Sequence, residues 1–466
     1  MIKTELWLIL CRLPDKSLRE IGKMTRSEYF NERDDVCRLL TVLCAQIKKQ
    51  TVFSREAAFG AVYPGEVFDP AKFRLILHFL TEIVRQYLVL QSLETPGWQR
   101  KLALGKALES LELDEPAADS LENGLHALQT TQLRGPEWYE HYFQARRDGL
   151  RLSIQSARTQ AIDLQGLADA QEAAYLITKL KIACEQCSHQ AVYKVEYDYG
   201  LLKNVLEAVE NDPKWAGHTG IRLYYLCCRC LMQPAHQHYF LELKPLLLKV
   251  ETVFPPAECR DLVLLTLNFC IRKLNDGELQ YAKEGLDIYT HALKNDYLME
   301  KGELSRFTFR NIVAMGLKIN AFDWVKSFIE GYSPKLPALH RDSMVNFSLA
   351  RLEYSRGNQV EAIYLLQKAD YEDILLHLAA KVMLMKIYYE SADFRRLESL
   401  CDTVRIFLRR KKIMGYHREN YLNIARYFEK LMALNPYDAE AKIQLRNALL
   451  QEEKLTEKEW FVEQLK

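Results

Sequence analysis

Two cysteine-rich segments carry the residue types and spacings that zinc sites use. The first, CEQCSH, covers residues 184–189, and the second, CCRCLMQPAHQH, covers residues 227–238. Structural zinc takes four nitrogen or sulfur ligands in a tetrahedron, and two cysteines separated by two residues often supply half of them. A zinc site built from both segments would use four ligands, namely Cys184, Cys187, Cys227 and Cys230.

The surroundings of both segments favour a packing role instead. Cys184 and Cys187 lie inside a run, residues 173–197, that has the composition of one helix, and Cys227 and Cys230 continue an apolar stripe at helical spacing. Free cysteine behaves as a small apolar side chain, and a CxxC pair within a helix lacks the geometry of a zinc knuckle. We therefore expect core cysteines and no bound metal, with the zinc site as the alternative.

Composition narrows the class of protein. The chain has 466 residues, with 63 Lys and Arg against 62 Asp and Glu, so its net charge of +1 gives no general reason for a nucleic-acid or membrane partner. Its 11 cysteines are scattered rather than set in a disulfide framework, which predicts a reducing cytoplasmic environment. The apolar stretch at residues 6–11 is too short for a signal peptide, and we expect no membrane-spanning segment.

One local run of charge stands out, RIFLRRKKIMGYHR at residues 405–418, which contains six Lys or Arg and no acidic residue. We expect it to be the solvent-exposed end of a helix, where basic side chains complement the helix dipole. Contact with phosphates or with an acidic partner is the alternative. The members of this 405–418 patch are Arg405, Arg409, Arg410, Lys411, Lys412 and Arg418.

No motif in the sequence indicates catalysis. The phosphate-binding pattern GxxxxGK[ST], the dinucleotide pattern GxGxxG, the nucleophile elbow GxSxG and the zinc-protease pattern HExxH are all missing. Acidic residues and histidines are numerous but dispersed. We therefore expect a protein that is not an enzyme, with no catalytic residues, no cofactor and no small-molecule substrate.

Apolar residues recur at helical spacing through almost every long segment, which predicts an all-α protein. In the clearest example, residues 69–93, Asp69 is a suitable N-cap and Pro70 a suitable first residue. Ser54 is expected to cap a short helix over 55–62, and Asn31 to cap the helix that follows it.

An internal repeat in the C-terminal third indicates the architecture. A shift of 35 residues superimposes 349–369 on 384–404, and the first segment resembles a tetratricopeptide repeat, with Ala362 at a small position of the second helix. Segment 311–332 is similar and is a further copy, and segment 269–293 is a weaker one. Helix pairs in series predict a tetratricopeptide-like superhelix, an α-solenoid.

A resemblance extends over nearly the whole chain. The segments RSEYFNERDDV, YPGEVFDPAKFRLILHFL, NIVAMGLKINAFDWVKSFIEGY, KIYYESADFRRLESLCDTVRIFLRRKK and EKEWFVEQL, in that order, are similar to an uncharacterised family of bacterial tetratricopeptide-like helical-repeat proteins. The resemblance implies the helical-repeat fold. It carries no established activity, ligand or catalytic residue.

We expect two parts, an N-terminal helical module at residues 1–97 and a repeat array at 98–466 that the segment 457–465 closes as a cap. A superhelix of this kind presents a concave face that binds partner segments. The predicted function is thus a scaffold for an unidentified protein partner. The candidate contacts are Asn346, Arg351 and Lys386, although we favour solvated surface residues as the interpretation of all three.

The alternative function is a transcriptional regulator that joins an N-terminal DNA-binding module to a repeat sensor domain. Residues 31–95 have the helix order that starts a winged-helix domain. A recognition helix needs an exposed basic face, whereas the helix over 70–93 offers only Lys72, Arg74, His78 and Arg85, and the segment after it is predicted to be helical rather than a β-wing. Nucleic-acid binding is therefore the less favoured expectation.

Overall fold

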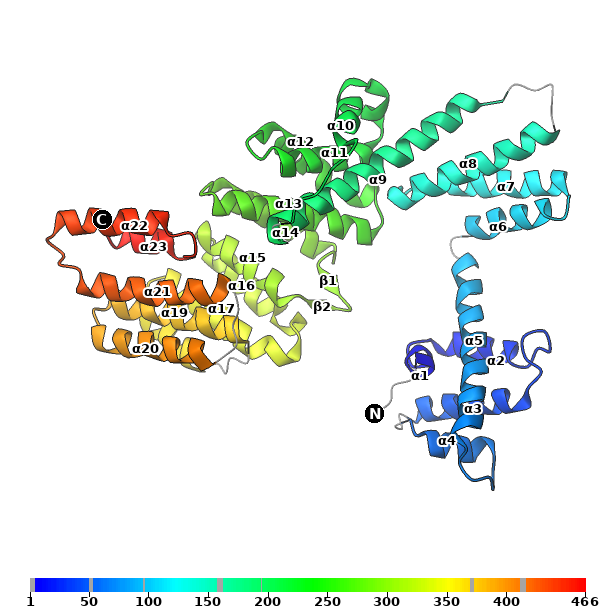
Figure 1. Ribbon diagram of the computed structural model, residues 1–466, viewed down its shortest axis with the longest axis horizontal. Helices are drawn as coiled ribbons and strands as arrows, with labels where there is room; N and C mark the ends of the chain where they lie inside the picture. Colours follow the sequence, from blue (N-terminus) through cyan, green and yellow to red (C-terminus); the bar gives the residue numbers. More distant parts are fainter. Residues whose placement is uncertain are drawn as a thin grey trace. The chain divides into compact units, whose positions relative to one another are not determined.

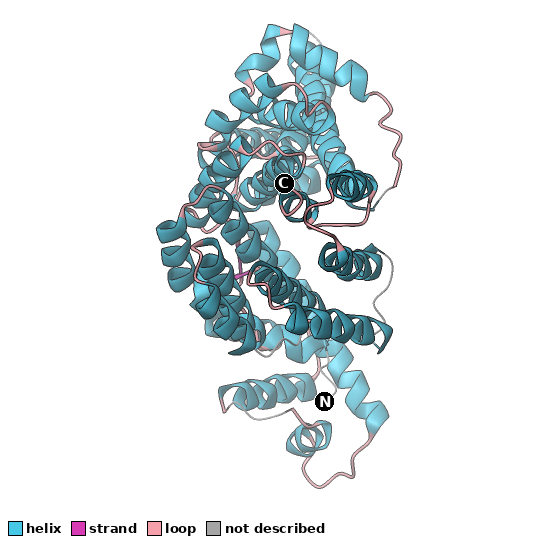
Figure 2. Ribbon diagram, turned by 90° about the vertical axis from the view of Figure 1, so that its left-hand side faces the viewer, coloured by secondary structure: helices cyan, strands magenta, loops and turns pink. Residues whose placement is uncertain are grey.

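The computed structural model describes residues 5–49, 53–94, 97–156, 162–193, 195–368, 373–410 and 416–466. Within these ranges the protein is all-α, as predicted, apart from one short β-hairpin that the sequence did not indicate (Figure 2). The hairpin pairs β1 (Met299–Glu300) with β2 (Glu303–Leu304) in antiparallel fashion. Its turn places Lys301 and Gly302 in the left-handed region, with φ of 54° and 82°.

The chain divides into two compact units, Met1–Tyr175 and Leu176–Lys466, which are described separately below. The division falls inside one long helix, and the module boundary at residue 97 stays a prediction. The helices that begin in the first unit are α1 (Glu5–Leu10), α2 (Asp15–Met24), α3 (Asp34–Lys48), α4 (Arg55–Val62), α5 (Pro70–Glu94), α6 (Trp98–Glu109), α7 (Asp114–Gln129), α8 (Pro136–Ser156) and α9 (Leu164–Tyr193).

The second unit continues with helices that Figure 1 colours from green to red. They are α10 (Leu202–Asn211), η1 (Pro213–Gly217), α11 (Thr219–Met232), α12 (Gln237–Leu247), η2 (Val250–Thr252), α13 (Pro256–Asn275), α14 (Gln280–Lys294), α15 (Arg306–Lys318), α16 (Phe322–Tyr332), η3 (Ser333–Lys335), α17 (Ala338–Ser355), α18 (Gln359–Lys368), α19 (Ile374–Glu390), α20 (Phe394–Arg410), α21 (Tyr416–Ala433), α22 (Ala439–Gln451) and α23 (Lys458–Glu463).

Helices α1 to α5 enclose a hydrophobic core of their own, which includes Leu39, Phe59, Phe73 and Leu80. Two of the three caps predicted here are confirmed. The Asp69 carboxylate accepts hydrogen bonds from the backbone N–H groups of Ala71 and Lys72, and the Ser54 hydroxyl accepts one from Ala57. Both caps satisfy backbone donors that a helix start leaves unpaired.

The predicted cap at Asn31 is wrong, because the helix that follows begins at Asp34 with Arg33 at its N-cap position. The Asn31 side chain instead folds a local turn. Its oxygen accepts from the Arg33 N–H at 3.1 Å, and its amide nitrogen donates to the Thr25 and Arg33 carbonyls at 2.8 Å each. Asparagine closes such turns as readily as it caps helices, so composition alone did not distinguish the two.

The four segments predicted as repeat copies each form two helices joined by the same turn (Figure 1). One residue of each turn is left-handed, with φ between 55° and 93°, and the N–H of the next residue donates to a carbonyl five positions earlier. This is the closure of a Schellman motif. The left-handed residues are Gly277, Asn320, Gly357 and Ala392.

Consecutive helices pack as pairs in this region, α13 with α14, α15 with α16, α17 with α18, and α19 with α20. The first helices of two successive pairs, α15 and α17, also pack on each other, and α19 packs on α21, the helix that follows the last pair. The α15–α16 pair approaches so closely that a Cβ atom at Gly316 would lie 2.4 Å from Cγ2 of Val325. Glycine is therefore required at this position because a larger side chain would not fit. Its backbone is helical, so backbone conformation does not demand glycine.

Candidate functional site

The cysteines proposed as zinc ligands lie in the interior of the second unit. Cys184 on α9 and Cys227 and Cys230 on α11 are at most 1% exposed, and Cys187 is partly buried. Cys187 contacts the Tyr199 hydroxyl at 3.3 Å. Burial raises the pKa of the Cys230 and Cys184 thiols, which favours their neutral form.

Within the described ranges, no group of three or more His, Cys, Asp or Glu side chains is arranged to hold a metal ion. Cys184, Cys227 and Cys230 are buried, as the helical spacing predicted for core cysteines. The absence of a bound metal stays a prediction.

The 405–418 patch is only partly free for contacts. Arg405 on α20 forms an ion pair with Glu429 on α21, and this hydrogen bond raises the pKa of its guanidinium. Arg409 and Arg410 end α20 and are exposed, as is Arg418 on α21, so these three remain accessible. Lys411 and Lys412 lie outside the described residues. The structure thus assigns one of the six residues to an internal pair.

Two of the four basic residues predicted on the recognition helix, Lys72 and Arg85, are paired with neighbouring carboxylates, whereas Arg74 and His78 are exposed. On α5, Lys72 pairs with Glu66 at 2.6 Å, and Arg85 pairs with Glu5 at 2.7 Å and with Glu82 at 2.6 Å. No strand occurs among residues 5–49 and 53–94, and α6 is the next described element after α5. A phosphate-binding stripe would require these cations to be unpaired.

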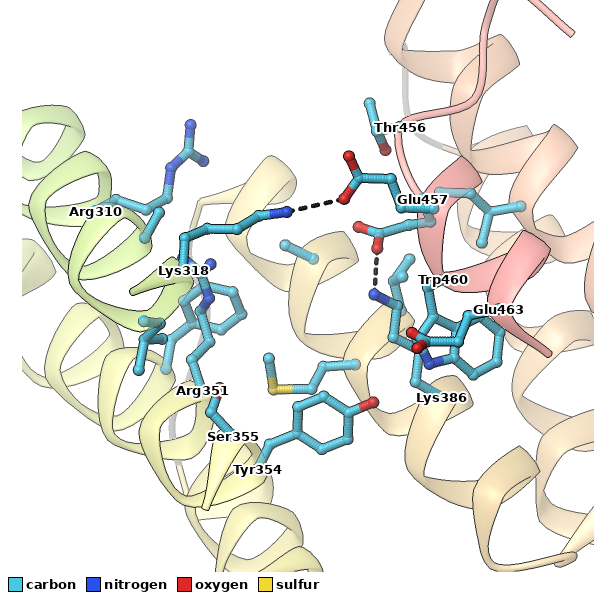
Figure 3. A pocket seen from close by; sticks show the side chains of 18 of the residues that line it. Arg310, Lys318, Arg351, Tyr354, Ser355, Lys386, Thr456, Glu457, Trp460 and Glu463 are labelled. Atoms are coloured by element: carbon cyan, nitrogen blue, oxygen red, sulfur yellow. Dashed lines mark hydrogen bonds and ion pairs between the residues drawn. The ribbon is translucent and has the colours of Figure 1, made fainter. Parts of the chain in front are cut away.

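A cavity of about 540 Å³ lies in the second unit, between α15, α17, α19, α21 and the segment 456–463 that contains α23 (Figure 3). We call it the C-terminal cavity. Residues one helical turn apart line it from each helix, for example Phe347, Arg351 and Tyr354 from α17. Ala314, Arg351 and Lys386 occupy equivalent repeat positions, since 351 − 314 = 37 and 386 − 351 = 35. One equivalent position from each of the three helix pairs therefore lines the cavity.

The segment 456–463 forms the opposite wall and is fixed at its start and in its middle. The Asn420 side chain accepts a hydrogen bond from the Thr456 N–H at 2.8 Å, and the Asn423 side chain donates to the Lys454 carbonyl at 3.0 Å. Phe461 is fully buried, with its ring centroid 4.9 Å from that of Phe428. The segment is therefore a packed part of the fold.

Carboxylates of this segment reach across to the helices. Glu457 pairs with Lys386, and Glu459 pairs with Lys318 at 2.8 Å (Figure 3). The first pair is the more sheltered, because the Lys386 side chain is 16% exposed whereas that of Glu459 is 72% exposed. A well-exposed ion pair contributes little stability, so the Lys386 contact is the stronger of the two.

An aromatic contact accompanies these charges. The Trp460 indole N–H donates to the Glu390 carboxylate at 2.8 Å, and the same carboxylate accepts from the Tyr354 hydroxyl. The Trp460 ring lies 5.6 Å from the Tyr389 ring in an edge-on arrangement. Burial and the Glu390 carboxylate both raise the pKa of Tyr354, so its hydroxyl stays protonated and acts as a donor.

Two guanidinium groups on the helix side of the cavity lack such partners. Arg310 on α15 and Arg351 on α17 have no carboxylate of the described residues within ion-pair distance and make no side-chain hydrogen bond to those residues. Burial lowers the pKa of Arg351, Glu457 raises it, and the positive charge of Arg310 lowers it further. The carboxylates of the opposite wall are paired with Lys386 and Lys318, whereas Arg310 and Arg351 form no ion pair with the described residues. These two guanidinium groups would attract an acidic ligand.

The sequence named two residues of this site and missed the others. Arg351 and Lys386 line the cavity, whereas Asn346 does not and donates to the carbonyl of Asp342 in its own helix. Arg310 and Lys318 were not singled out, although a shift of 37 residues places Arg310 in register with Phe347 on the same helix face. Extending the repeat register to α15 would have found this face.

The sequence matches no model of a known protein family, and no curated protein is similar to it. None of the helices in the described ranges combines the length and the apolar character that crossing a membrane requires. The geometry of the C-terminal cavity is thus the main guide to function.

Proposed function

We propose that this protein is a cytoplasmic, non-enzymatic scaffold that binds a segment of a partner protein in the C-terminal cavity. Its helix pairs would form a tetratricopeptide-like superhelix, of the kind predicted by the 35-residue repeat. The four turns with one left-handed residue support this arrangement, as does the packing of α15 on α17, the first helices of successive pairs. In such a superhelix the first helices line the concave face.

The observation that carries the proposal is the contact between this face and the segment 456–463. The face holds a short helix by pairing lysines with carboxylates and by an edge-on contact between the Tyr389 and Trp460 rings. These are the interactions by which grooves of helical repeats recognise peptides. About 540 Å³ of the cavity remains next to Arg310 and Arg351, which is room for further side chains.

The test compares partners recovered with the tagged full-length protein and with Ala314→Trp, which fills the cavity from α15. Quantitative mass spectrometry after nuclease treatment is the readout. We expect a defined protein partner that survives nuclease and is lost from Ala314→Trp. The matched control is Ala439→Trp, at an exposed position of α22, which should retain the partner.

Two outcomes would contradict the scaffold assignment at this site. If Ala314→Trp retains the partner as well as the control does, the cavity is not where the partner binds. If every partner disappears on nuclease treatment, the protein is a nucleic-acid binder, and the N-terminal module and the 405–418 patch become the regions to examine. Circular dichroism of Ala314→Trp confirms that the variant is folded.

A further inference from the structure

Arg310 and Arg351 form no ion pair with the described residues, whereas other cations on or directly after the same helices do. Arg306 on α15 pairs with Asp373 at 2.7 Å, and Arg356, directly after α17, pairs with Asp323 at 2.9 Å and Glu353 at 3.3 Å. The chain thus supplies carboxylates to neighbouring cations but none, within the described residues, to this pair.

A partly buried guanidinium without a carboxylate is costly. Removal from water disfavours its charge, and a second positive group nearby adds repulsion. The lowered pKa of Arg351 reflects these effects. Binding an anion between the two groups would offset both, because a guanidinium holds a carboxylate through two parallel hydrogen bonds.

The cavity also indicates which anion it suits. Glu457 and Glu459 already occupy positions on Lys386 and Lys318, at the side of the cavity formed by the segment 456–463. Arg310 and Arg351 lie on the helix side of the same space (Figure 3). An incoming acidic segment would therefore continue a row of carboxylate contacts that the chain itself begins.

We propose that Arg310 and Arg351 form a subsite for a side-chain carboxylate of an acidic, unphosphorylated partner segment. This inference rests on the proposed scaffold function and specifies the chemistry of the partner. The aliphatic and aromatic wall made by Ala314 and Phe347 would pack against the methylene groups of the bound side chain. The affinity is expected to fall with salt, since the contact is largely electrostatic.

The experiment measures binding of a fluorescein-labelled hexaglutamate peptide to the full-length protein by fluorescence anisotropy. The double variant Arg310→Gln/Arg351→Gln should bind at least about tenfold more weakly, because each guanidinium supplies charge-assisted hydrogen bonds. Arg446→Gln removes an exposed arginine of α22 and should bind like the wild type. Arg310→Lys/Arg351→Lys keeps both charges and should fall between the two, because lysine cannot form the bidentate contact.

Three results would overturn the subsite. The wild type and the double glutamine variant could bind hexaglutamate equally, or the wild type could fail to bind it at all. A phosphoserine peptide of equal charge or a short DNA duplex could also bind the wild type far more tightly, which would assign the pair to phosphate. Thermal unfolding of each variant shows whether weaker binding reflects a folding defect.

Failure of this inference is distinguishable from failure of the scaffold function. If Ala314→Trp loses the cellular partner while the double glutamine variant keeps it, the cavity binds a protein segment but not through these arginines. If hexaglutamate binding depends on the arginines while Ala314→Trp keeps the cellular partner, the subsite exists but the partner docks elsewhere.

Discussion

Asp35 in the first unit and Arg351 in the C-terminal cavity of the second unit are both charged groups that are at least partly buried, but their surroundings differ. Asp35 is 9% exposed and receives hydrogen bonds from the Arg33 guanidinium, at 2.7 and 3.1 Å, and from the Tyr63 hydroxyl. These contacts lower the pKa of Asp35, the Arg33 hydrogen bond being the largest cause. Arg351 has no such partner among the described residues.

The difference indicates that Asp35 stabilises the fold, whereas Arg351 is available to bind a ligand. Asp35 joins the start of α3 to the residue after α4, so its satisfied carboxylate fixes the position of one helix against another. Arg351 contributes no comparable bond while its desolvation remains unfavourable. Residues that lower the stability of the folded state and form no stabilising contact in it are typical of binding sites.

The largest effect is expected from removing the wall of the cavity. Phe461→Ala should lower the free energy of unfolding of the second unit by about 3–4 kcal/mol, because the ring is fully buried and its loss leaves a cavity. Hydrogen exchange should accelerate in α19 and α21 and stay unchanged in α1 to α5. Leu450→Ala, at a position 57% exposed, is the control and should change little. Equal acceleration in α1 to α5 would show that the two regions do not unfold separately.

A smaller effect is expected at the satisfied charge. Asp35→Ala should destabilise the N-terminal module by about 2 kcal/mol, since it leaves Arg33 and the buried Tyr63 hydroxyl without their acceptor. The readout is hydrogen exchange of α3 and α4 in urea. Asp34→Ala removes an exposed carboxylate from the same helix turn and should cost about 0.5 kcal/mol. Similar losses for both variants would remove the distinction drawn for Asp35.

Removing the charge of Arg351 should have the opposite effect on the free energy of unfolding. Arg351→Met is expected to raise the free energy of unfolding by about 1 kcal/mol, because it replaces a partly buried charge that forms no ion pair with the described residues by an unbranched apolar side chain. Arg356→Met, which breaks the pairs with Asp323 and Glu353, should instead lose up to about 1 kcal/mol. Urea unfolding followed by circular dichroism measures both. A loss of stability for Arg351→Met would mean that this arginine has a structural role.

The smallest expected effect is the pH dependence of the stability that Asp35 contributes. Because the folded-state pKa of Asp35 lies below its unfolded value of about 3.9, its contribution to stability is fully present above that pH and is lost as the pH falls through the folded-state pKa. The stability difference between the wild type and Asp35→Asn should thus be constant near neutral pH and shrink below about pH 4. A difference that stays constant into acid would show that the carboxylate charge is not the stabilising feature.

Local sequence was sufficient for much of the secondary structure. Asp69 and Ser54 cap helices as predicted, because N-caps depend on a side chain and on backbone groups two or three residues away. Asn31 was assigned wrongly, since its side chain bonds to Thr25, six residues earlier, across a turn that the helical pattern does not encode.

By itself, the sequence determined the all-α class, the helix pairs near the 35-residue repeat and the burial of most cysteines on α9 and α11, because helical periodicity is written in neighbouring residues. Only the tertiary structure decided which charges are paired. Arg405 meets Glu429 and Lys386 meets Glu457 across helices, whereas Arg310 and Arg351 meet no carboxylate of the described residues. Pairing depends on which helix faces converge, and that is set by packing between segments up to 141 residues apart, as in the pair of Lys318 with Glu459.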